Sequence, residues 1–163
     1  MSATTPSMAE PRSLGAIDWQ FVAFESLSPQ QLYAVLQLRG EVFMIEQNCV
    51  FQDMDGFDNQ AMHLLGVSDG ELLAYARCFP AGVKFAEASI GRVLTRASAR
   101  GLGLGHVLMR QAIDRLAAQW GSQPITIGAQ ARLEGFYRQH GFATVGDPYI
   151  EDAIPHIEML RQS

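Results

Sequence analysis

The chain has 163 residues, of which 48% are hydrophobic and 18% charged, and its net charge is −5. This length and balance predict one globular domain with a substantial core, and the negative charge argues against nucleic acid as a partner, because surfaces that bind it are normally basic. Cys49 and Cys78 lack the spacing of metal ligands or of a disulfide framework, and no apolar run of 18 residues could span a membrane. We therefore expect a cytoplasmic protein with no metal and no membrane contact.

The first segment is rich in Ser, Thr, Pro and Ala and shows no helical periodicity. Such a composition favours disorder, so we expect a disordered tail over residues 1–16 and a single domain over residues 17–163. Residues 17–25 mix large apolar and polar side chains in partial alternation, which predicts a first strand.

A helix start follows at Ser28. Ser28 is a suitable N-cap, Pro29 fits the first helical position, and Gln31 can close a capping box. Apolar residues then recur at helical spacing as far as Gln47. Gly40 lies in the middle of this pattern and indicates a bend or a close packing contact.

The next elements are predicted to be a three-stranded meander. Apolar runs at residues 63–67 and 71–79 flank Ser-Asp-Gly, and Asp-Gly favours a type I′ hairpin turn. A further apolar run covers residues 86–95. Gly91 lies inside that run and suggests a β-bulge, a feature that often lies beside an active site.

Charged residues interrupt several of these apolar elements. Arg39 and Glu46 fall on the apolar stripe of the first helix, and Arg77 and Arg92 lie within strands. Each could form a buried ion pair or could contact a substrate, and the sequence leaves both interpretations open. The loop after the helix carries acids that are either solvated or face an amine: Asp53, Asp55 and Asp58.

The central motif is a glycine-rich loop between the last strand of the meander and a new helix. It runs from Arg100 through Gly101, Gly103 and Gly105 to His106. Glycines allow close approach to the backbone, and the unpaired N–H groups at a helix start attract an anion such as pyrophosphate. His106 stands where a P-loop needs Lys and where a dinucleotide-binding loop needs Gly, so neither motif fits.

The remaining elements complete an α+β order. The helix behind the glycine loop has a broad apolar face and a stop signal at Gly121. We expect a strand at residues 124–128, a helix at 131–140 ended by Gly141, and a final strand at 156–160. The resulting order, β-α-β-β-β-α-β-α-β, predicts a mixed, mostly antiparallel sheet flanked by helices.

Two motifs carry a family resemblance. Arg100-x-x-Gly103-x-Gly105 resembles the acyl-CoA loop of the GCN5-related N-acetyltransferase (GNAT) superfamily, and the segment from Gln130 through Tyr137 to Gly141-Phe142 resembles its last conserved helix. Further stretches are similar to the ElaA-type branch, among them Ile90-Gly91-Arg92-Val93 and the ending from Glu151 to Met159. The resemblance implies the GNAT fold over nearly all of the chain after the tail.

The implied activity is direct transfer of an acetyl group from acetyl-CoA to an amine on a small molecule or a chain terminus. The alternative is a non-catalytic module that binds acyl-CoA on the same fold. Retention of Tyr137, the implied acid for the leaving thiolate, favours the enzyme. The oligomeric state is open, with a homodimer as one option.

The resemblance also implies site residues. The candidates for the base are Glu46, Glu151 and His156, and the candidates for contact with the acceptor are Arg39, Glu46, Arg77, Arg92 and Glu151. Contacts with the cofactor are implied for Val93, Leu94, Thr95, Arg100, Gly101, Leu102, Gly103, Leu104, Gly105, His106, Gln130, Phe136 and Tyr137. The acids of the chain further favour a cationic acceptor.

Overall fold

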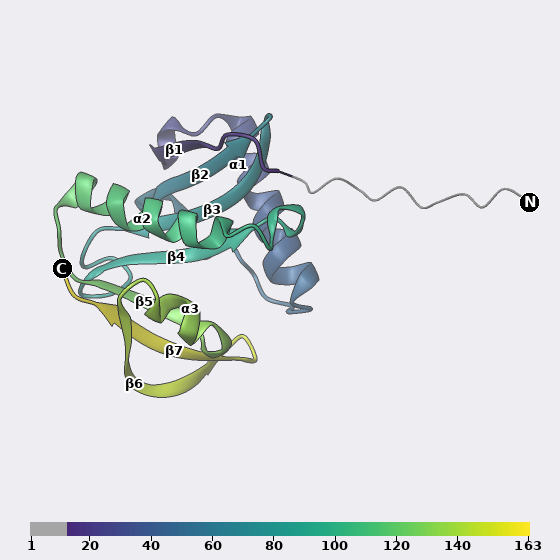
Figure 1. Ribbon diagram of the computed structural model, residues 1–163. Coiled ribbons are helices and arrows are strands. Elements are labelled where there is room, and N and C mark those ends of the chain that lie inside the picture. The colour runs from purple at the N-terminus through teal and green to yellow at the C-terminus, as the bar shows by residue number, and fades with distance from the viewer. Residues whose placement is uncertain (1–12) are drawn as a thin grey trace, which may run out of the picture.

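The computed structural model describes residues 13–163, in which seven strands form one sheet (Figure 1). The strand order is β1-β2-β3-β4-β5-β7-β6, and every neighbouring pair is antiparallel except β4 and β5. The predicted α+β class is confirmed. The strands are β1 (Asp18–Ala23), β2 (Met62–Ser68), β3 (Glu71–Phe79), β4 (Ala88–Thr95), β5 (Ile125–Gln130), β6 (Phe142–Glu151) and β7 (Ile154–Arg161).

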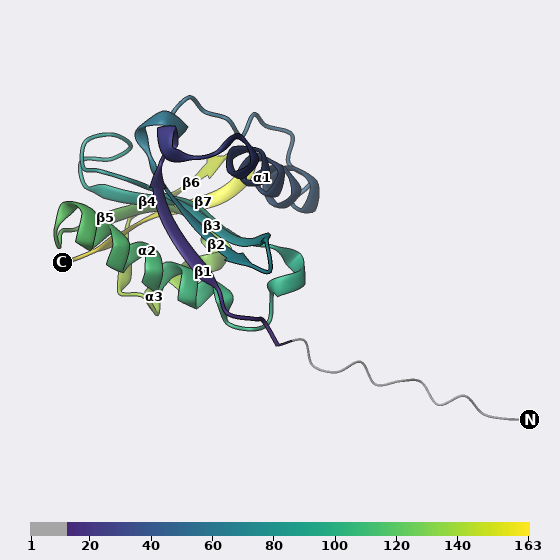
Figure 2. The ribbon, with the colours of Figure 1, turned by 90° about the horizontal axis from the view of Figure 1, so that it is seen from above.

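Three α-helices accompany the sheet: α1 (Pro29–Arg39), α2 (Leu104–Trp120) and α3 (Glu134–Arg138). Helices α1 and α2 cover opposite faces of the sheet (Figure 2). Two separate apolar clusters correspond to these two faces, one containing Leu38 of α1 and the other Leu108 of α2. None of the helices in residues 13–163 is both long and apolar enough to cross a membrane.

Most of the predicted tail, residues 1–12, lies outside the described part of the chain. Residues 13–16 form neither helix nor strand, but Leu14 packs against the core cluster beneath α2. The chain is therefore already held against the domain a few residues before β1.

The start of α1 confirms the predicted capping box. The Ser28 hydroxyl accepts a hydrogen bond from the Gln31 backbone N–H at 3.1 Å, and the Gln31 side chain accepts one from the Ser28 N–H at 2.9 Å. At Gly40, where a bend or a close packing contact was expected, the α-helix instead gives way to a π-helix over Gly40–Glu46, and a Cβ on Gly40 would meet nothing within 4 Å. The wider π turn shifts the helical phase, so Arg39 and Glu46 no longer share a stripe as they would in a uniform α-helix.

The β2–β3 hairpin has the predicted turn, since Asp69 and Gly70 both have positive φ, as a type I′ turn requires. Strand β6 is an element that the sequence interpretation missed. It pairs with β7, but its side chains are mostly exposed and its register shifts between Val145 and Tyr149, around Pro148. An exposed, interrupted strand shows neither regular alternation nor a continuous apolar run, and this explains the omission.

Candidate active site

The site begins where the parallel strands β4 and β5 separate. They pair only at Ala88–Ile125 and Ser89–Thr126, and beyond these pairs the ribbons diverge (Figure 1). On its other edge β4 has one residue more than β3 between the pairs Leu94–Tyr75 and Gly91–Arg77, so Arg92 and Val93 form a bulge. The bulge expected near Gly91 is thus confirmed, one residue further on.

A cavity of about 710 Å³ lies between the diverging strands. Its walls include residues 90–95 of β4, residues 127–130 of β5, and parts of the π-helix, α3 and the β6–β7 hairpin. The side chain of Leu94 is buried against α1. Because β4 has lost β5 as a partner here, the edge of β4 that faces β5 offers backbone N–H and C=O groups to this cavity, as it would to an added strand.

The glycine loop has the geometry that the sequence predicted. Gly101 and Gly103 have φ of +82° and +75°, and a Cβ on either would meet nothing within 4 Å. Gly103 is the N-cap of α2, and no side chain caps this helix start. The first amides of α2 are therefore open to an incoming anion.

Arg100 fixes this loop to two neighbouring elements. Its guanidinium donates to the Thr95 carbonyl oxygen at 2.8 Å and lies 2.7 Å from a carboxylate oxygen of Glu46. The ion pair joins the loop to the end of the π-helix. Glu46 is a candidate base that lines the cavity, but this pair occupies one of its oxygens.

The expected cofactor residues divide between several places. Leu104 is buried in the core. Gly101 lines neither the cavity between β4 and β5 nor a second hollow, which lies outside it. This second hollow, beside the start of α2 and the end of α3, is lined by Leu102, Gly103 and His106. The cavity between β4 and β5 is lined by the others: Val93, Leu94, Thr95, Arg100, Gly105, Gln130, Phe136 and Tyr137.

One contact of the second hollow was not anticipated. His106 Nδ1 lies 2.9 Å from His140 Nε2, and both rings contact Phe136. Burial, together with the charges of His106, Arg110 and Arg161, lowers the pKa of His140. No sequence motif signalled this pair, because 34 residues separate its members.

Tyr137 projects from α3 into the wall of the cavity and is only 7% exposed. Its ring packs edge-to-face against Phe136 and Phe142. Burial raises the pKa of Tyr137 to about 12, and the nearby charge of Arg132 opposes the shift only in part. The phenol therefore keeps its proton near neutral pH and can donate it.

The β6–β7 hairpin contributes Glu151 and His156 to the same cavity. The two side chains lie 3.7 Å apart, but the imidazole is 11% exposed and the carboxylate 59%. His156 also stacks on the Tyr149 ring. His156 is thus held by its surroundings, whereas Glu151 lies at the rim.

Two amide side chains of the cavity lining, Gln47 and Gln130, contact each other. Gln130, at the end of β5, donates to Gln47 at 3.0 Å and accepts from Arg132 at 3.1 Å. These contacts join the π-helix end to β5 across the gap between the strands. Among residues 13–163 no group of three or more His, Cys, Asp or Glu could hold a metal ion.

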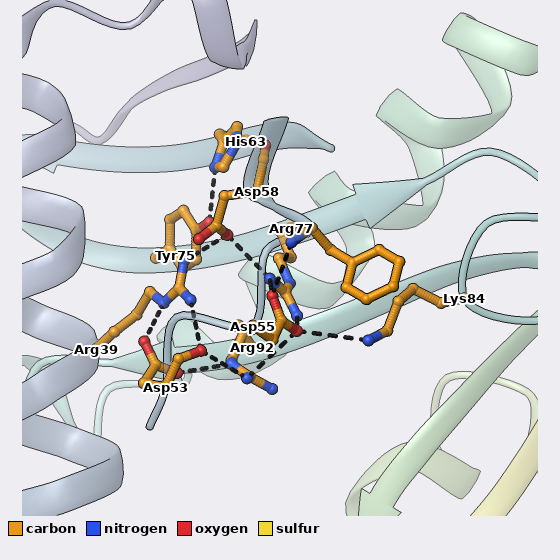
Figure 3. Close-up of polar contacts among 10 residues, drawn as sticks. Arg39, Asp53, Asp55, Asp58, His63, Tyr75, Arg77, Lys84 and Arg92 are labelled. Carbon is orange, nitrogen blue, oxygen red and sulfur yellow. Dashed lines mark hydrogen bonds and ion pairs between the residues drawn. The ribbon is translucent and has the colours of Figure 1, made fainter. Parts of the chain in front are cut away.

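Arg39 and Arg77 do not line the cavity, contrary to the expectation that they contact a substrate. They are 0% and 2% exposed and belong to a network of ion pairs beneath it (Figure 3). Arg39 binds Asp53 at 2.6 Å and Asp58 at 2.7 Å, and Arg77 binds Asp58 at 2.9 Å and also binds Asp55. The two arginines thus hold the loop after the π-helix against the sheet.

The loop acids are therefore engaged by arginine. Burial by itself would raise the pKa of Asp55 and Asp58, but hydrogen bonds from Arg77 and Arg39 outweigh it and hold both values below the usual range. These acids do not form the open anionic surface on which a cationic acceptor was predicted. Arg92 differs from the two buried arginines because it lines the cavity.

Comparison with known proteins identifies the class that this fold and site define. Residues 24–162 match the family model described as an acetyltransferase (GNAT) domain. The chain therefore belongs to the GNAT family of acetyltransferases. Within that family it is similar to Protein ElaA of Escherichia coli strain K12, with 43% identity over 148 residues that cover 90% of this chain and 97% of the relative.

Solved structures agree with this assignment. An acyl-CoA N-acyltransferase from Pseudomonas aeruginosa is 42% identical, with a TM-score of 0.85 over 90% of this chain and 99% of that one. The crystal structure of E. coli ElaA is also 42% identical, with a TM-score of 0.84 and coverage of 90% and 100%. An aminoglycoside 6′-N-acetyltransferase complexed with coenzyme A shares the fold at 14% identity, with a TM-score of 0.66 over 88% and 96% of the chains.

Proposed function

We propose that the protein transfers an acetyl group directly from acetyl-CoA to an amine. The observation that carries this proposal is the cavity between β4 and β5, which has the open helix start of α2 near one end and the protonated phenol of Tyr137 in its wall. The similarity to an acyl-CoA N-acyltransferase supports a thioester donor.

The donor would be held mainly by backbone groups. Residues 93–95 lie on the β4 edge that has lost β5 as a partner, and they can pair with the amide groups of a pantetheine arm. A β4 amide near the thioester carbonyl would stabilise negative charge on its oxygen during attack. The open amides at Gly103–Gly105 suit the pyrophosphate.

The chemistry then needs one base and one acid. His156 or another base takes a proton from the amine, the amine nitrogen bonds to the carbonyl carbon, and the carbon–sulfur bond breaks. Tyr137 donates a proton to the leaving sulfur. One proton leaves nitrogen and one reaches sulfur, so the reaction balances and no covalent enzyme intermediate is needed.

A cytoplasmic location is part of the proposal. It is supported by the two cysteines of the described chain, Cys49 and Cys78, which are both free thiols. Free thiols persist most readily in a reducing compartment.

The test measures free CoA thiol after mixing the protein with acetyl-CoA and a panel of primary amines. Amine-dependent CoA release together with the acetylated amine supports transfer. Binding of acetyl-CoA without release for any amine would favour the non-catalytic acyl-CoA module instead. Absence of acetyl-CoA binding would contradict both functions.

A further inference from the structure

The ion-pair network beneath the cavity carries an excess of positive charge. Its carboxylates are Asp53, Asp55 and Asp58, whereas its cations are Arg39, Arg77, Arg92 and Lys84. His63 also contacts the network, because its Nε2 lies 2.8 Å from the Asp58 backbone oxygen, and burial lowers the pKa of its ring. The network therefore has four positive and three negative groups.

The carboxylates in the buried part of the network are engaged by arginine, although the buried Arg77 Nε has no hydrogen-bond partner. Asp53 binds Arg39 through one oxygen at 2.6 Å and Arg92 through the other at 2.7 Å. Asp55 accepts from Arg77 through both oxygens. The remaining positive charge is thus carried at the outer side of the network, by Arg92 and Lys84.

Both outer cations line the cavity. Lys84 Nζ lies 3.4 Å and Arg92 Nη2 lies 3.6 Å from the same oxygen of Asp55, which brings the two positive groups together (Figure 3). Neither is fully occupied by protein partners. Within residues 13–163, Arg92 Nη1 has no hydrogen-bond acceptor, and the three donors of Lys84 have the single acceptor Asp55. The Lys84 ammonium also lies 4.2 Å from the centroid of the Phe57 ring.

The β4 bulge accounts for the position of Arg92. Arg92 has φ of +49°, an uncommon conformation for a residue with a side chain. A bulge re-aims the side chain that it contains, and here the guanidinium reaches the Asp53 backbone oxygen at 3.0 Å from the strand that forms the cavity wall. The bulge thus places the positively charged guanidinium of Arg92 beside the cavity.

We propose that the amine acceptor also carries an anionic group, a carboxylate or a phosphate, which Arg92 and Lys84 bind. This inference rests on the proposed acetyltransferase function and specifies its acceptor. Arginine and lysine donors bind carboxylate and phosphate oxygens strongly, most of all where burial limits competition from water. The two side chains are 24% and 30% exposed, so water competes with such an anion only in part.

Of the acids that line the cavity, Asp55 is bound by Arg77 and Glu46 by Arg100, which leaves those of the β6–β7 hairpin. Glu151, Asp152 and His156 come from the β6–β7 hairpin and can receive the amine end of the acceptor. A zwitterionic molecule therefore matches the lining, with its anion at Arg92 and Lys84 and its amine at the hairpin. This acceptor replaces the purely cationic one predicted from the acidic composition.

The test compares acceptors that differ only in the anionic group. For aminoalkyl chains of several lengths, the ω-amino carboxylate, the aminoalkyl phosphate and the neutral ω-amino amide are assayed with acetyl-CoA. The best anionic member should have a kcat/KM about tenfold above its amide, the size expected for a charged hydrogen bond. The carboxylate and phosphate arms identify which anion is used. Equal values for all three members at every length would overturn the proposal.

The variant Lys84→Gln then tests the site itself, because it removes one charge while Arg92 continues to bind Asp53. It should raise KM for the preferred anionic acceptor by about tenfold and leave kcat/KM for the amide unchanged. Arg138→Gln removes an equal charge from an exposed pair with Glu134, and it should change neither value. Equal losses for anionic and amide acceptors in Lys84→Gln would contradict a role in recognition.

Binding measurements keep this test separate from the test of transfer. Calorimetry of the same compounds with CoA present reports recognition even if no amine is acetylated. If the parent protein prefers the anionic compound and Lys84→Gln abolishes this preference, the acceptor site is supported even when no turnover occurs. Absent turnover would then count against the enzyme alone. Turnover of neutral or cationic amines alone would support the enzyme and reject the acceptor site.

Discussion

His156 Nδ1 lies 2.7 Å from the backbone carbonyl oxygen of Ile154. A carbonyl oxygen can only accept, so this contact requires the proton to be on Nδ1. In the neutral ring Nε2 then carries the lone pair. The side chain lines the cavity. This geometry favours His156 as the general base over Glu46, which is paired with Arg100, and over the largely exposed Glu151.

The first prediction concerns this base. In His156→Asn the amide nitrogen can still donate to Ile154, but the Nε2 lone pair is lost. We expect turnover to fall by ~10²–10⁴, the usual contribution of a general base, with the melting temperature and acetyl-CoA affinity nearly unchanged. Steady-state kinetics, calorimetry and thermal unfolding of the same samples measure the three quantities.

Two carboxylate variants serve as comparisons. Glu46→Gln and Glu151→Gln should each reduce turnover by less than His156→Asn. A larger loss in either variant, with normal turnover in His156→Asn, would transfer the role of base to that carboxylate.

The second prediction concerns the glycine loop. Saturation with acetyl-CoA at about a hundred times its Kd should stabilise the protein by about 2.7 kcal/mol, which corresponds to roughly 5–10 °C in melting temperature. Gly103→Glu places a negative side chain at the open start of α2 and should abolish this shift. Thermal unfolding with and without acetyl-CoA measures both effects.

Gly121→Glu is a matched control for that variant. Gly121 ends the same helix, has φ of +88°, and has equally open surroundings for a Cβ. Gly121→Glu should lower stability more than Gly103→Glu, because its φ of +88° and ψ of 159° lie in a region almost confined to glycine, but it should retain the shift with acetyl-CoA. An equal shift in both variants would remove the glycine loop from the binding site.

The sequence predicted local features well and pairings between distant residues poorly. Ser28 and Gln31 form the predicted capping box because such a box depends on residues three apart, and the turn at Asp69-Gly70 is equally local. The glycine loop was found for the same reason, because Gly101, Gly103 and the start of α2 lie within one short segment. Local patterns were therefore sufficient to place α1, the β2–β3 hairpin and the glycine loop.

The partners of the charged residues could not be predicted in this way. Arg39 lies 14 residues from Asp53, and Arg77 lies 22 residues from Asp55, so each pairing depends on how the loop folds back onto the sheet. The sequence left an ion pair and a substrate contact open for Arg39, Arg77 and Arg92. Only the three-dimensional arrangement separates the two buried residues from Arg92.

The third prediction concerns the stability of that network. In Arg39→Met the buried Asp53 and the half-buried Asp58 each lose one of two arginine partners and keep the other, and we expect a loss of about 3 kcal/mol in the free energy of unfolding, the lower end for a broken buried ion pair. Arg138→Met breaks an exposed pair with Glu134 and should cost less than about 0.5 kcal/mol. Urea unfolding of both variants measures the difference, and similar losses would contradict a structural role for the network.

The fourth prediction concerns acid unfolding. The folded protein holds the pKa of Asp55 and Asp58 below the usual range, so their stabilisation is present above about pH 4, the ordinary value for an unfolded Asp. It should be lost as the pH falls from there toward the folded values. Urea unfolding at a series of acid pH values should show this decline, and Asp58→Asn should flatten it. An equally steep decline in the variant would exclude Asp58 as a contributor.

The last prediction tests Tyr137 and separates an enzyme from a binding module. Because burial raises the pKa of Tyr137 to about 12, the phenol is protonated at neutral pH and available to the leaving sulfur. Tyr137→Phe keeps the ring and its packing on Phe136 and Phe142, so turnover should fall by ~10²–10⁴ with acetyl-CoA affinity little changed. A core tyrosine without a catalytic role would give the reverse pattern, with lower stability and nearly normal turnover. Measurement of turnover, affinity and melting temperature on the parent and the variant decides between these outcomes, and unchanged turnover would remove Tyr137 from the mechanism.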